Sequence, residues 1–277
     1  MNSIYIKQMI HFFKQSDLPD RFIDIYPVTK KDGQKTVYQM MESTFDPLPL
    51  SKNLILSLSI LFSLVDAYVD LKHPDLVNYC FKDKAKRLPN TEKTEACFKE
   101  CYSVLRVLRN ACIHSKDDLV YHNKVLSYTE TTKKENDRIV IREEGIDYLT
   151  TFFRRVIGND FGNNFTSRHK EIFTVTLYNK IKESIPDFTR QLQNIKNQEP
   201  FGSMEWSVRY YFKNPDFEKK SDDSFEITEK PNQHYPTDYL INFQNNQYLI
   251  PSEILSDSQI ITLEEAKKWK LEETRRD

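Results

Sequence analysis

The sequence contains few of the residues that build turns, and it has no long apolar run. Only five of the 277 residues are glycine, which disfavours glycine-rich nucleotide loops and turn-rich all-β folds. The longest apolar run, residues 54–65, contains serines and is shorter than the roughly 20 residues that span a bilayer. We therefore expect no membrane-spanning helix and no membrane partner.

The chain also lacks an excess of either charge. Forty Lys and Arg residues oppose 41 Asp and Glu residues, which leaves a net charge of −1. A protein-wide positive field of the kind that attracts nucleic acid is therefore absent, and an RNA-binding surface would have to be a local patch. The start of the sequence carries Lys7, His11 and Lys14 and no small-residue cleavage site, so we expect no signal peptide and a cytoplasmic location.

Four cysteines lie between residues 80 and 112, and three of them share one helical stripe: Cys97, Cys101 and Cys112. This pattern indicates buried, reduced thiols, as in a cytoplasmic protein. A zinc site that also used His114 is disfavoured, because Cys112 lies about 16 Å beyond Cys101 on a straight helix. Zinc holds sulfur at only about 2.3 Å. We expect neither a metal nor a cofactor.

Two stretches have strong helical periodicity. Residues 95–114 carry one apolar stripe and end on Arg109, Asn110 and His114; the last two are four residues apart and so share a face. Residues 51–71 are apolar on most sides, which favours cover by a second subunit as well as by a bundle. Their one polar stripe is either a solvated face or a contribution of Asp66 or Asp70 to the same cleft as Arg109.

The residues 105–115, LRVLRNACIHS, contain the pattern Arg-Asn-x-x-x-His. This arrangement resembles the signature of the HEPN family, and the resemblance covers residues 46–158. It implies a small helical bundle, a homodimer with both motifs in one cleft, and metal-independent cleavage of RNA in phage defence or toxin–antitoxin biology, with a protein antitoxin or regulator as a further partner. Lys116 stands where one toxin branch has a tyrosine, which argues against that branch and its nucleotidyltransferase antitoxin.

The motif residues suit RNA cleavage that leaves 2′,3′-cyclic phosphate ends. An arginine such as Arg109 binds phosphate through charge-assisted hydrogen bonds and stays protonated. A histidine such as His114 exchanges a proton near neutral pH, with the attacking 2′-hydroxyl or the leaving 5′-oxygen. Asn110 can orient either partner. Arg106 and Lys116 are candidates, with Asp66 and Asp70, to line the cleft.

Helical geometry restricts how these residues can meet. If residues 109–114 are all helical, Arg109 and His114 point about 140° apart. Either the helix unwinds near Ile113, or the site is composite and takes residues from two copies of the chain.

The same residues are also compatible with a protein that has no catalytic activity. Arg109 could pair with Asp66 or Asp70 while His114 only ends the helix, since histidine at a helix C-terminus is favourable by itself. The chain would then be a HEPN-like dimeric interaction or regulatory module. A catalytic cleft should gather Arg106, Arg109, His114 and Lys116 on an open surface, whereas a scaffold should bury or neutralise them.

The resulting fold prediction is mainly α. It comprises an N-terminal arm (1–45), a HEPN-like helical bundle with a β-hairpin insertion (46–158), a helical extension (159–198) and a small mixed α/β C-terminal module (199–277). Residues 22–27 and 36–40 flank a turn and form either a hairpin or an irregular arm. Pro186 is expected to separate two helices, and Thr262 with Glu265 is expected to cap a final helix.

Overall fold

The computed structural model describes residues 5–7, 10, 21–29, 36–44, 54–114, 118–130, 137–158, 166–198, 209–221, 223–229, 236–255 and 258–271. The chain divides into two compact units. Unit 1 comprises Met1–Arg21, Thr44–Asp160 and Thr174–Lys196, and unit 2 comprises Phe22–Ser43, Phe161–Phe173 and Asn197–Asp277. Both units are therefore assembled from segments that are distant in the sequence.

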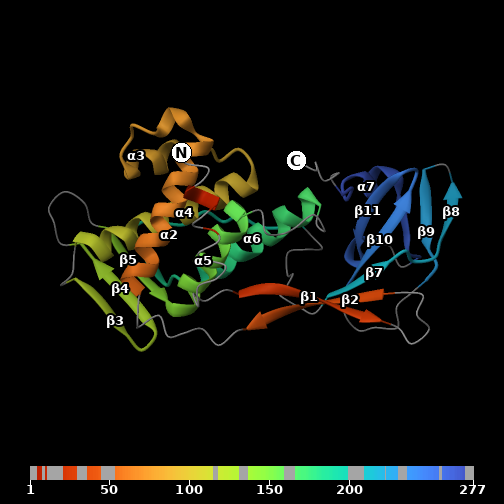
Figure 1. Cartoon of the computed structure of the whole chain (residues 1–277), viewed down its shortest axis with the longest axis horizontal. Helices are drawn as coiled ribbons and strands as arrows, with labels where there is room; N and C mark the ends of the chain where they lie inside the picture. The colour runs from red at the N-terminus through yellow and green to blue at the C-terminus, as the bar shows by residue number, and fades with distance from the viewer. Residues whose placement is uncertain are drawn as a thin grey trace. The chain divides into compact units, whose positions relative to one another are not determined.

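The helices of unit 1 pack around two long members, α2 (Leu54–Lys72) and α4 (Lys93–His114) (Figure 1). The short helix α3 (Phe81–Arg87), α5 (Glu143–Gly158) and the second part of α6 (Ser167–Glu183) complete the set, with a 3₁₀ turn at Pro74–Leu76. Aromatic contacts join Phe62 to Tyr102 and Tyr68 to Phe98, so α2 and α4 run antiparallel. Aromatic side chains of α5 extend the same core, with Phe153 edge-on to Phe98.

A four-stranded antiparallel sheet belongs to the same unit, in the order β3 (Leu119–His122), β4 (Val125–Thr129), β5 (Arg138–Arg142) and β6 (Asp187–Phe188). Asn123 and Lys124 join β3 to β4 with φ angles of 50° and 61°. Two consecutive residues with positive φ make the type I′ turn that matches the twist of a hairpin. The short strand β6 adds to β5 from a distant part of the chain, with Ile139 opposite Phe188.

Unit 2 contains two sheets. The five-stranded sheet has the order β1 (Arg21–Thr29), β2 (Thr36–Thr44), β7 (Arg209–Lys213), β10 (Thr237–Phe243) and β11 (Asn246–Pro251). The three-stranded sheet has the order β12 (Ile260–Thr262), β9 (Ser224–Ile227) and β8 (Phe217–Ser221). A 3₁₀ turn (Ser252–Ile254) and the short helix α7 (Leu263–Lys267) complete the unit.

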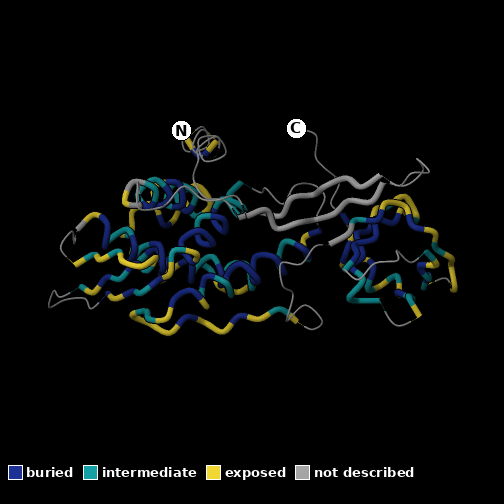
Figure 2. The backbone as a smooth tube through the Cα atoms, turned by 90° about the horizontal axis from the view of Figure 1, so that it is seen from below, coloured by how far each residue is buried: buried dark blue, intermediate teal, exposed yellow. Residues whose placement is uncertain are grey.

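Trp269 is the largest fully buried side chain of unit 2 and packs among residues from both of its sheets. Figure 2 shows the buried backbone of β10 and β11 in dark blue. The His169 ring lies edge-on to Trp269, its Nδ1 is 2.8 Å from the Thr166 hydroxyl, and its Nε2 is 3.8 Å from the carboxylate of the fully buried Asp238. This polar cluster is enclosed by the core, which indicates a structural role.

The predicted fold class is wrong. The protein is mixed α/β, not a mainly α HEPN-like bundle with a β-hairpin insertion and a small mixed module at the end. Unit 1 carries a four-stranded sheet, and residues 22–27 and 36–40 lie in adjacent strands of the five-stranded sheet. Residues after Pro186 form β6, followed by bends and irregular backbone, where a second helix was expected. The missed strands pair across long sequence separations, a relationship that local periodicity does not reveal.

Several local predictions are confirmed. Residues 54–72 and 93–114 are helices, and β4 and β5 form the antiparallel pair of the expected β-hairpin insertion. The Thr262 hydroxyl accepts a hydrogen bond from the Glu265 amide at 3.2 Å and caps α7. In the predicted N-terminal arm, residues 5–7 and 10 are helical.

The chain itself covers most of the apolar surface of α2. Its buried side chains are Leu58, Leu61, Phe62, Leu64, Val65 and Val69. Apolar excess in this helix is therefore not a reason to invoke a second subunit. Among the described residues, no helix combines the length and apolar character that a bilayer crossing needs.

Gly145, in the first turn of α5, lies where this helix approaches the end of α6. A Cβ atom at position 145 would meet the Ser184 Cβ at 2.6 Å and the Ile141 side chain at 2.9 Å. We predict that Gly145→Ala lowers the free energy of unfolding by about 1–3 kcal/mol, although alanine normally favours a helix. Denaturant unfolding measures this, and a Gly145→Ala protein as stable as the wild type would show that α5 and α6 are not packed this closely.

Candidate functional site

The candidate site lies at the C-terminal end of α4, a helix whose start and core face are both well defined. The Glu95 carboxylate accepts hydrogen bonds from the backbone amides of Thr91 and Glu92, at 3.0 and 3.2 Å, and so satisfies free donors at the helix start. Leu105 and Leu108 are fully buried, in line with the predicted stripe. The core therefore fixes the rotation of α4 and the direction in which its last residues point.

Arg109 is half-buried and is held by contacts to other side chains. The carbon of its guanidinium lies 4.9 Å from the ring centre of Phe81 and 5.6 Å from that of Phe62, within the range of cation–π attraction. Its Nη1 donates a hydrogen bond to the Asn110 Oδ1 at 3.2 Å. Two adjacent motif residues are thus joined, and two aromatic rings from α2 and α3 position the guanidinium.

The backbone of α4 is helical from Lys93 to His114 without interruption. Of the two arrangements left open by the sequence, local unwinding near Ile113 is excluded by this continuity. Positions 109 and 114 are therefore about 140° apart around one helix. The His114 side chain and the whole of Lys116 lie outside the described residues.

Asp66 and Asp70 are engaged by a lysine from α3. The Lys84 ammonium lies 3.0 Å from the Asp66 carboxylate and 2.5 Å from that of Asp70, and its own side chain is only 3% exposed. The Tyr102 hydroxyl donates to Asp66 at 2.8 Å. α3 thus covers the polar stripe of α2 at these two residues, while Ser63 on the same stripe is exposed.

The ionisation of this cluster follows from its contacts. Burial alone would lower the pKa of Lys84, but hydrogen bonds to Asp70 and Asp66 outweigh it and raise that pKa. Burial, reinforced by the charge of Asp66, raises the pKa of the Tyr102 hydroxyl. Lys84 is therefore charged and Tyr102 neutral at physiological pH.

Arg106 also has an acidic partner. Its guanidinium forms a two-pronged contact with Asp137, at 2.9 and 3.1 Å, and both side chains are largely buried. The fork geometry of arginine suits such a carboxylate. One of the four positive candidates, Arg106, is thus neutralised in the way expected of a scaffold.

The buried cysteines are not suited to reactive chemistry. Burial raises the pKa of Cys112 to about 11 and raises that of Cys101 well above its usual value, which disfavours the thiolate that attacks substrates or binds metals. In the described part of the chain, no three His, Cys, Asp or Glu side chains are placed to share a metal ion.

Sequence reasoning missed three residues that shape the site: Phe81, Lys84 and Asp137. Phe81 and Lys84 are three residues apart on α3, so they share a face, but the surrounding Lys-rich segment has the composition of an exposed link. Asp137 follows a polar loop and pairs with a residue 31 positions earlier. No spacing within the sequence connects these residues with the motif.

Comparison of the chain with known proteins gives no match among family models, curated proteins or solved structures. The function must therefore be argued from the residues and their geometry.

The Lys84 cluster generates a stability prediction. We expect Lys84→Met to lower the free energy of unfolding by about 3–5 kcal/mol, because it leaves two largely buried carboxylates without their cation. Since the Lys84 pKa is raised in the folded state, this stabilisation is present in full below the ordinary lysine pKa and is lost only as pH rises through the raised value.

The matched control is Lys86→Met on the same helix, whose side chain is 66% exposed and whose nearest acidic oxygen is 3.8 Å away. This substitution should change stability by less than about 0.5 kcal/mol. Urea unfolding of both variants at neutral pH measures the difference, and equal stability of the two would contradict the proposed importance of the Lys84 contacts.

Proposed function

We propose that this protein is a metal-independent, HEPN-type endoribonuclease that acts in the cytoplasm, in phage defence or toxin–antitoxin biology. The observation that carries the proposal is the fixed Arg109 guanidinium, held by Phe62, Phe81 and Asn110 at the end of a helix that continues to His114. A positioned guanidinium is the group best suited to stabilise charge on a phosphate that is being displaced.

The proposed reaction needs no cofactor. The RNA 2′-hydroxyl attacks the adjacent phosphorus, and the bond from phosphorus to the 5′-oxygen breaks. Arg109 stabilises the negative charge on the phosphate oxygens, and Asn110 orients the reacting groups through its amide. His114 transfers a proton, either from the attacking 2′-hydroxyl or to the leaving 5′-oxygen. The products carry a 2′,3′-cyclic phosphate and a 5′-hydroxyl.

Because α4 is a continuous helix, the proposal requires a composite site that takes residues from two copies of the chain. Positions 109 and 114 face directions about 140° apart, so one straight helix does not aim both at one phosphate. Two copies related by a twofold axis would place Arg109 of one chain opposite His114 of the other.

Exposed apolar side chains support an interface at this end of the helix pair. Ile113 is 42% exposed, and Ile55, at the start of the antiparallel α2, is 50% exposed. Because α2 and α4 run antiparallel, the start of α2 lies beside the end of α4. A second copy of the chain that met this end would bury both isoleucines beside the motif.

A second candidate is a non-catalytic dimeric interaction or regulatory module. The pairing of Arg106 with Asp137 favours it, because that arginine is neutralised rather than presented to a ligand. In this case Arg109 would serve to pack α4 against α2 and α3. Direct assay of cleavage separates the two functions.

We predict that the purified protein cleaves single-stranded RNA in excess EDTA and leaves cyclic phosphate ends. His114→Ala should slow cleavage by about 10²–10⁴-fold, the usual contribution of general acid–base catalysis. Arg109→Ala should slow it by at least about 10²-fold, because the charge on the displaced phosphate loses its stabilising group. Gel electrophoresis of end-labelled RNA measures the rates, and phosphatase resistance identifies the cyclic ends.

The chain offers matched controls for both substitutions. His122 is an exposed histidine on β3, and Arg87 is an exposed arginine that lies over the Tyr79 ring at 4.1 Å, much as Arg109 lies over phenylalanines. His122→Ala and Arg87→Ala should cleave at the wild-type rate. If all variants cleave alike, the activity belongs to a contaminant, and if the wild type does not cleave, the interaction module is the better account.

The composite site predicts complementation between inactive chains. Arg109→Ala and His114→Ala proteins, mixed in equal amounts and allowed to exchange subunits, should recover about a quarter of the wild-type activity. Half of the random dimers are mixed, and each mixed dimer holds one of two sites with both residues intact. Light scattering should show a species of twice 33.0 kDa.

A site built within one chain predicts no recovery, because each chain of the mixed dimer would lack one residue. Ile113→Asp provides the interface control: it should convert the dimer to the monomer and abolish both wild-type activity and complementation. A monomer with full wild-type activity would rule out the composite arrangement.

A further inference from the structure

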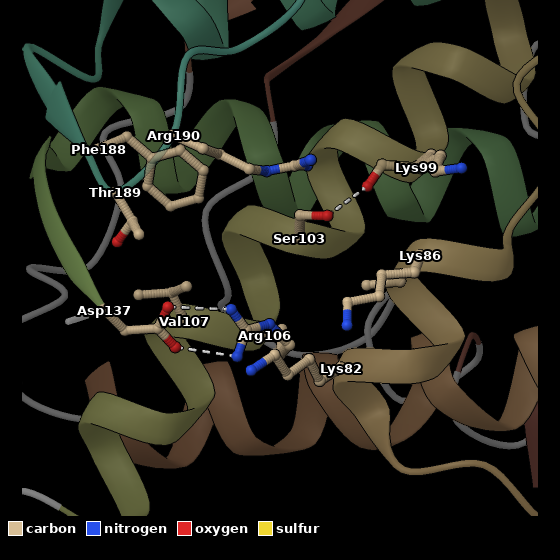
Figure 3. Close-up of a pocket in the computed structure, with 11 residues that line it drawn as sticks. Lys82, Lys86, Lys99, Ser103, Arg106, Val107, Asp137, Phe188, Thr189 and Arg190 are labelled. Atoms are coloured by element: carbon tan, nitrogen blue, oxygen red, sulfur yellow. Dashed lines mark hydrogen bonds and ion pairs between the residues drawn. The ribbon is translucent and has the colours of Figure 1, made fainter. Parts of the chain in front are cut away.

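Unit 1 contains a pocket lined in part by residues of α3 and α4 (Figure 3). Its volume is about 530 Å³, within the range of small-molecule sites. Its wall is formed by side chains of α3 and α4, by Asp137 just before β5, and by Phe188 of β6 with the two residues that follow it.

The pocket wall carries an excess of positive charge, although the net charge of the whole chain is close to zero. Five of its wall residues are cationic and one is a carboxylate, whereas the whole protein has a net charge of −1. A concave surface lined by one sign of charge raises the local concentration of ions of the opposite sign. The electrostatics of this pocket therefore favour an anion.

Three of the cations are fixed in place by their own contacts. Arg106 is held by Asp137, Arg190 contacts the buried Glu100 at 3.1 Å, and the Lys99 ammonium donates to the Leu88 carbonyl at 2.7 Å. The side chains of Lys82 and Lys86 extend from α3 toward the same space as Arg106 (Figure 3). The pocket thus combines a wall of positioned cations with two lysines of α3 that reach into the same space, as a charged ligand would require.

The remaining wall residues suit a planar, partly apolar group. The half-buried Phe188 ring stands beside Thr189 and across the pocket from Lys86 (Figure 3), and Ala85 and Val107 add buried apolar surface. Aromatic rings stack on nucleobases whatever their sequence, typically for about 1–3 kcal/mol per base in nucleic-acid complexes. A simple anion would make no use of this side of the pocket.

We propose that this pocket is a nucleotide-binding site, with the phosphates at Lys82 and Lys86 and the base against Phe188. This inference does not rest on the proposed ribonuclease activity, because it requires binding only. Two sources supply the same chemistry: a free nucleoside phosphate, as an effector, or one nucleotide of an RNA chain. Since Arg106 precedes Asn110 by one turn on α4, an RNA strand held here would pass close to the motif.

The test is direct binding to the whole wild-type chain by isothermal titration calorimetry at low and moderate salt. The probes are ATP, AMP, inorganic phosphate and a short oligouridylate with 2′-O-methyl groups, which the proposed cleavage chemistry cannot attack. Saturable binding of ATP that weakens with salt identifies the free nucleotide as the source. Binding of the oligouridylate without ATP or AMP identifies the RNA chain.

Charge reversal locates the site. Lys82→Glu with Lys86→Glu should weaken binding by at least about tenfold, because two attractions of the phosphate become repulsions. The control is Lys72→Glu, an exposed lysine at the end of α2 that is not part of the pocket wall, and it should leave affinity unchanged. Thermal unfolding and circular dichroism verify that each variant is folded.

Asp137→Asn is expected to change the affinity in the opposite direction. The amide keeps the shape and one acceptor for Arg106 but removes the only carboxylate among the pocket wall residues, so binding should tighten by about threefold or more. Phe188→Ala should weaken the binding of ATP and leave the binding of inorganic phosphate unchanged.

Three results would overturn the proposal. The first is no saturable binding of any probe, and the second is equal loss of affinity in Lys72→Glu and the double α3 variant. The third is equal affinity for ATP and inorganic phosphate together with no effect of Phe188→Ala, which would leave only an unspecific anion site. Because no step of this test measures cleavage, an inactive ribonuclease would not decide it.

Discussion

The Lys84 ammonium, shared between the carboxylates of Asp66 and Asp70, is the contact on which the arrangement of unit 1 depends. It belongs to α3, a helix of seven residues, which is too short to be stable in isolation. Removing three charges from water is costly, and the cost is offset only by close geometry and the further hydrogen bond from Tyr102. These contacts hold α3 against α2 and α4 at one rotation about its axis.

That rotation determines what both sides of α3 present. On the side of Lys84, Phe81 lies against the Arg109 guanidinium and limits where the motif arginine can point. On the other side, Lys82 and Lys86 reach the pocket, where Arg106 is fixed by Asp137. One short helix therefore connects the position of the motif with the shape of the pocket. A ligand that moved α3 from the pocket side would also move Phe81, and with it the ring against which the Arg109 guanidinium lies.

Local patterns in the sequence predicted local structure, but they did not predict contacts between residues that are far apart in the sequence. The apolar stripe of α4, the β4–β5 pair and the Thr262 cap were all predictable, because each depends on residues a few positions apart. The mixed α/β fold was not predictable from local patterns. For example, β6 is only two residues long and pairs with a strand about fifty positions earlier. At the candidate site, Arg109 and Asn110 were proposed from the sequence, and the structure joins them by a hydrogen bond. It contained no sign of Phe81 or Asp137, whose roles arise only when α3 and β5 meet α4.

The five-stranded sheet of unit 2 takes β1 and β2 from the first fifty residues and its other strands from the last seventy. Val37 pairs with Phe212, so nearly all of unit 1 must leave the ribosome before β2 meets its neighbour β7. Until then the hydrogen-bonding edge of β2 is open to unrelated strands, a state that favours aggregation and the need for chaperones. The order of synthesis thus makes the later strands β7, β10 and β11 complete the sheet that β1 and β2 begin.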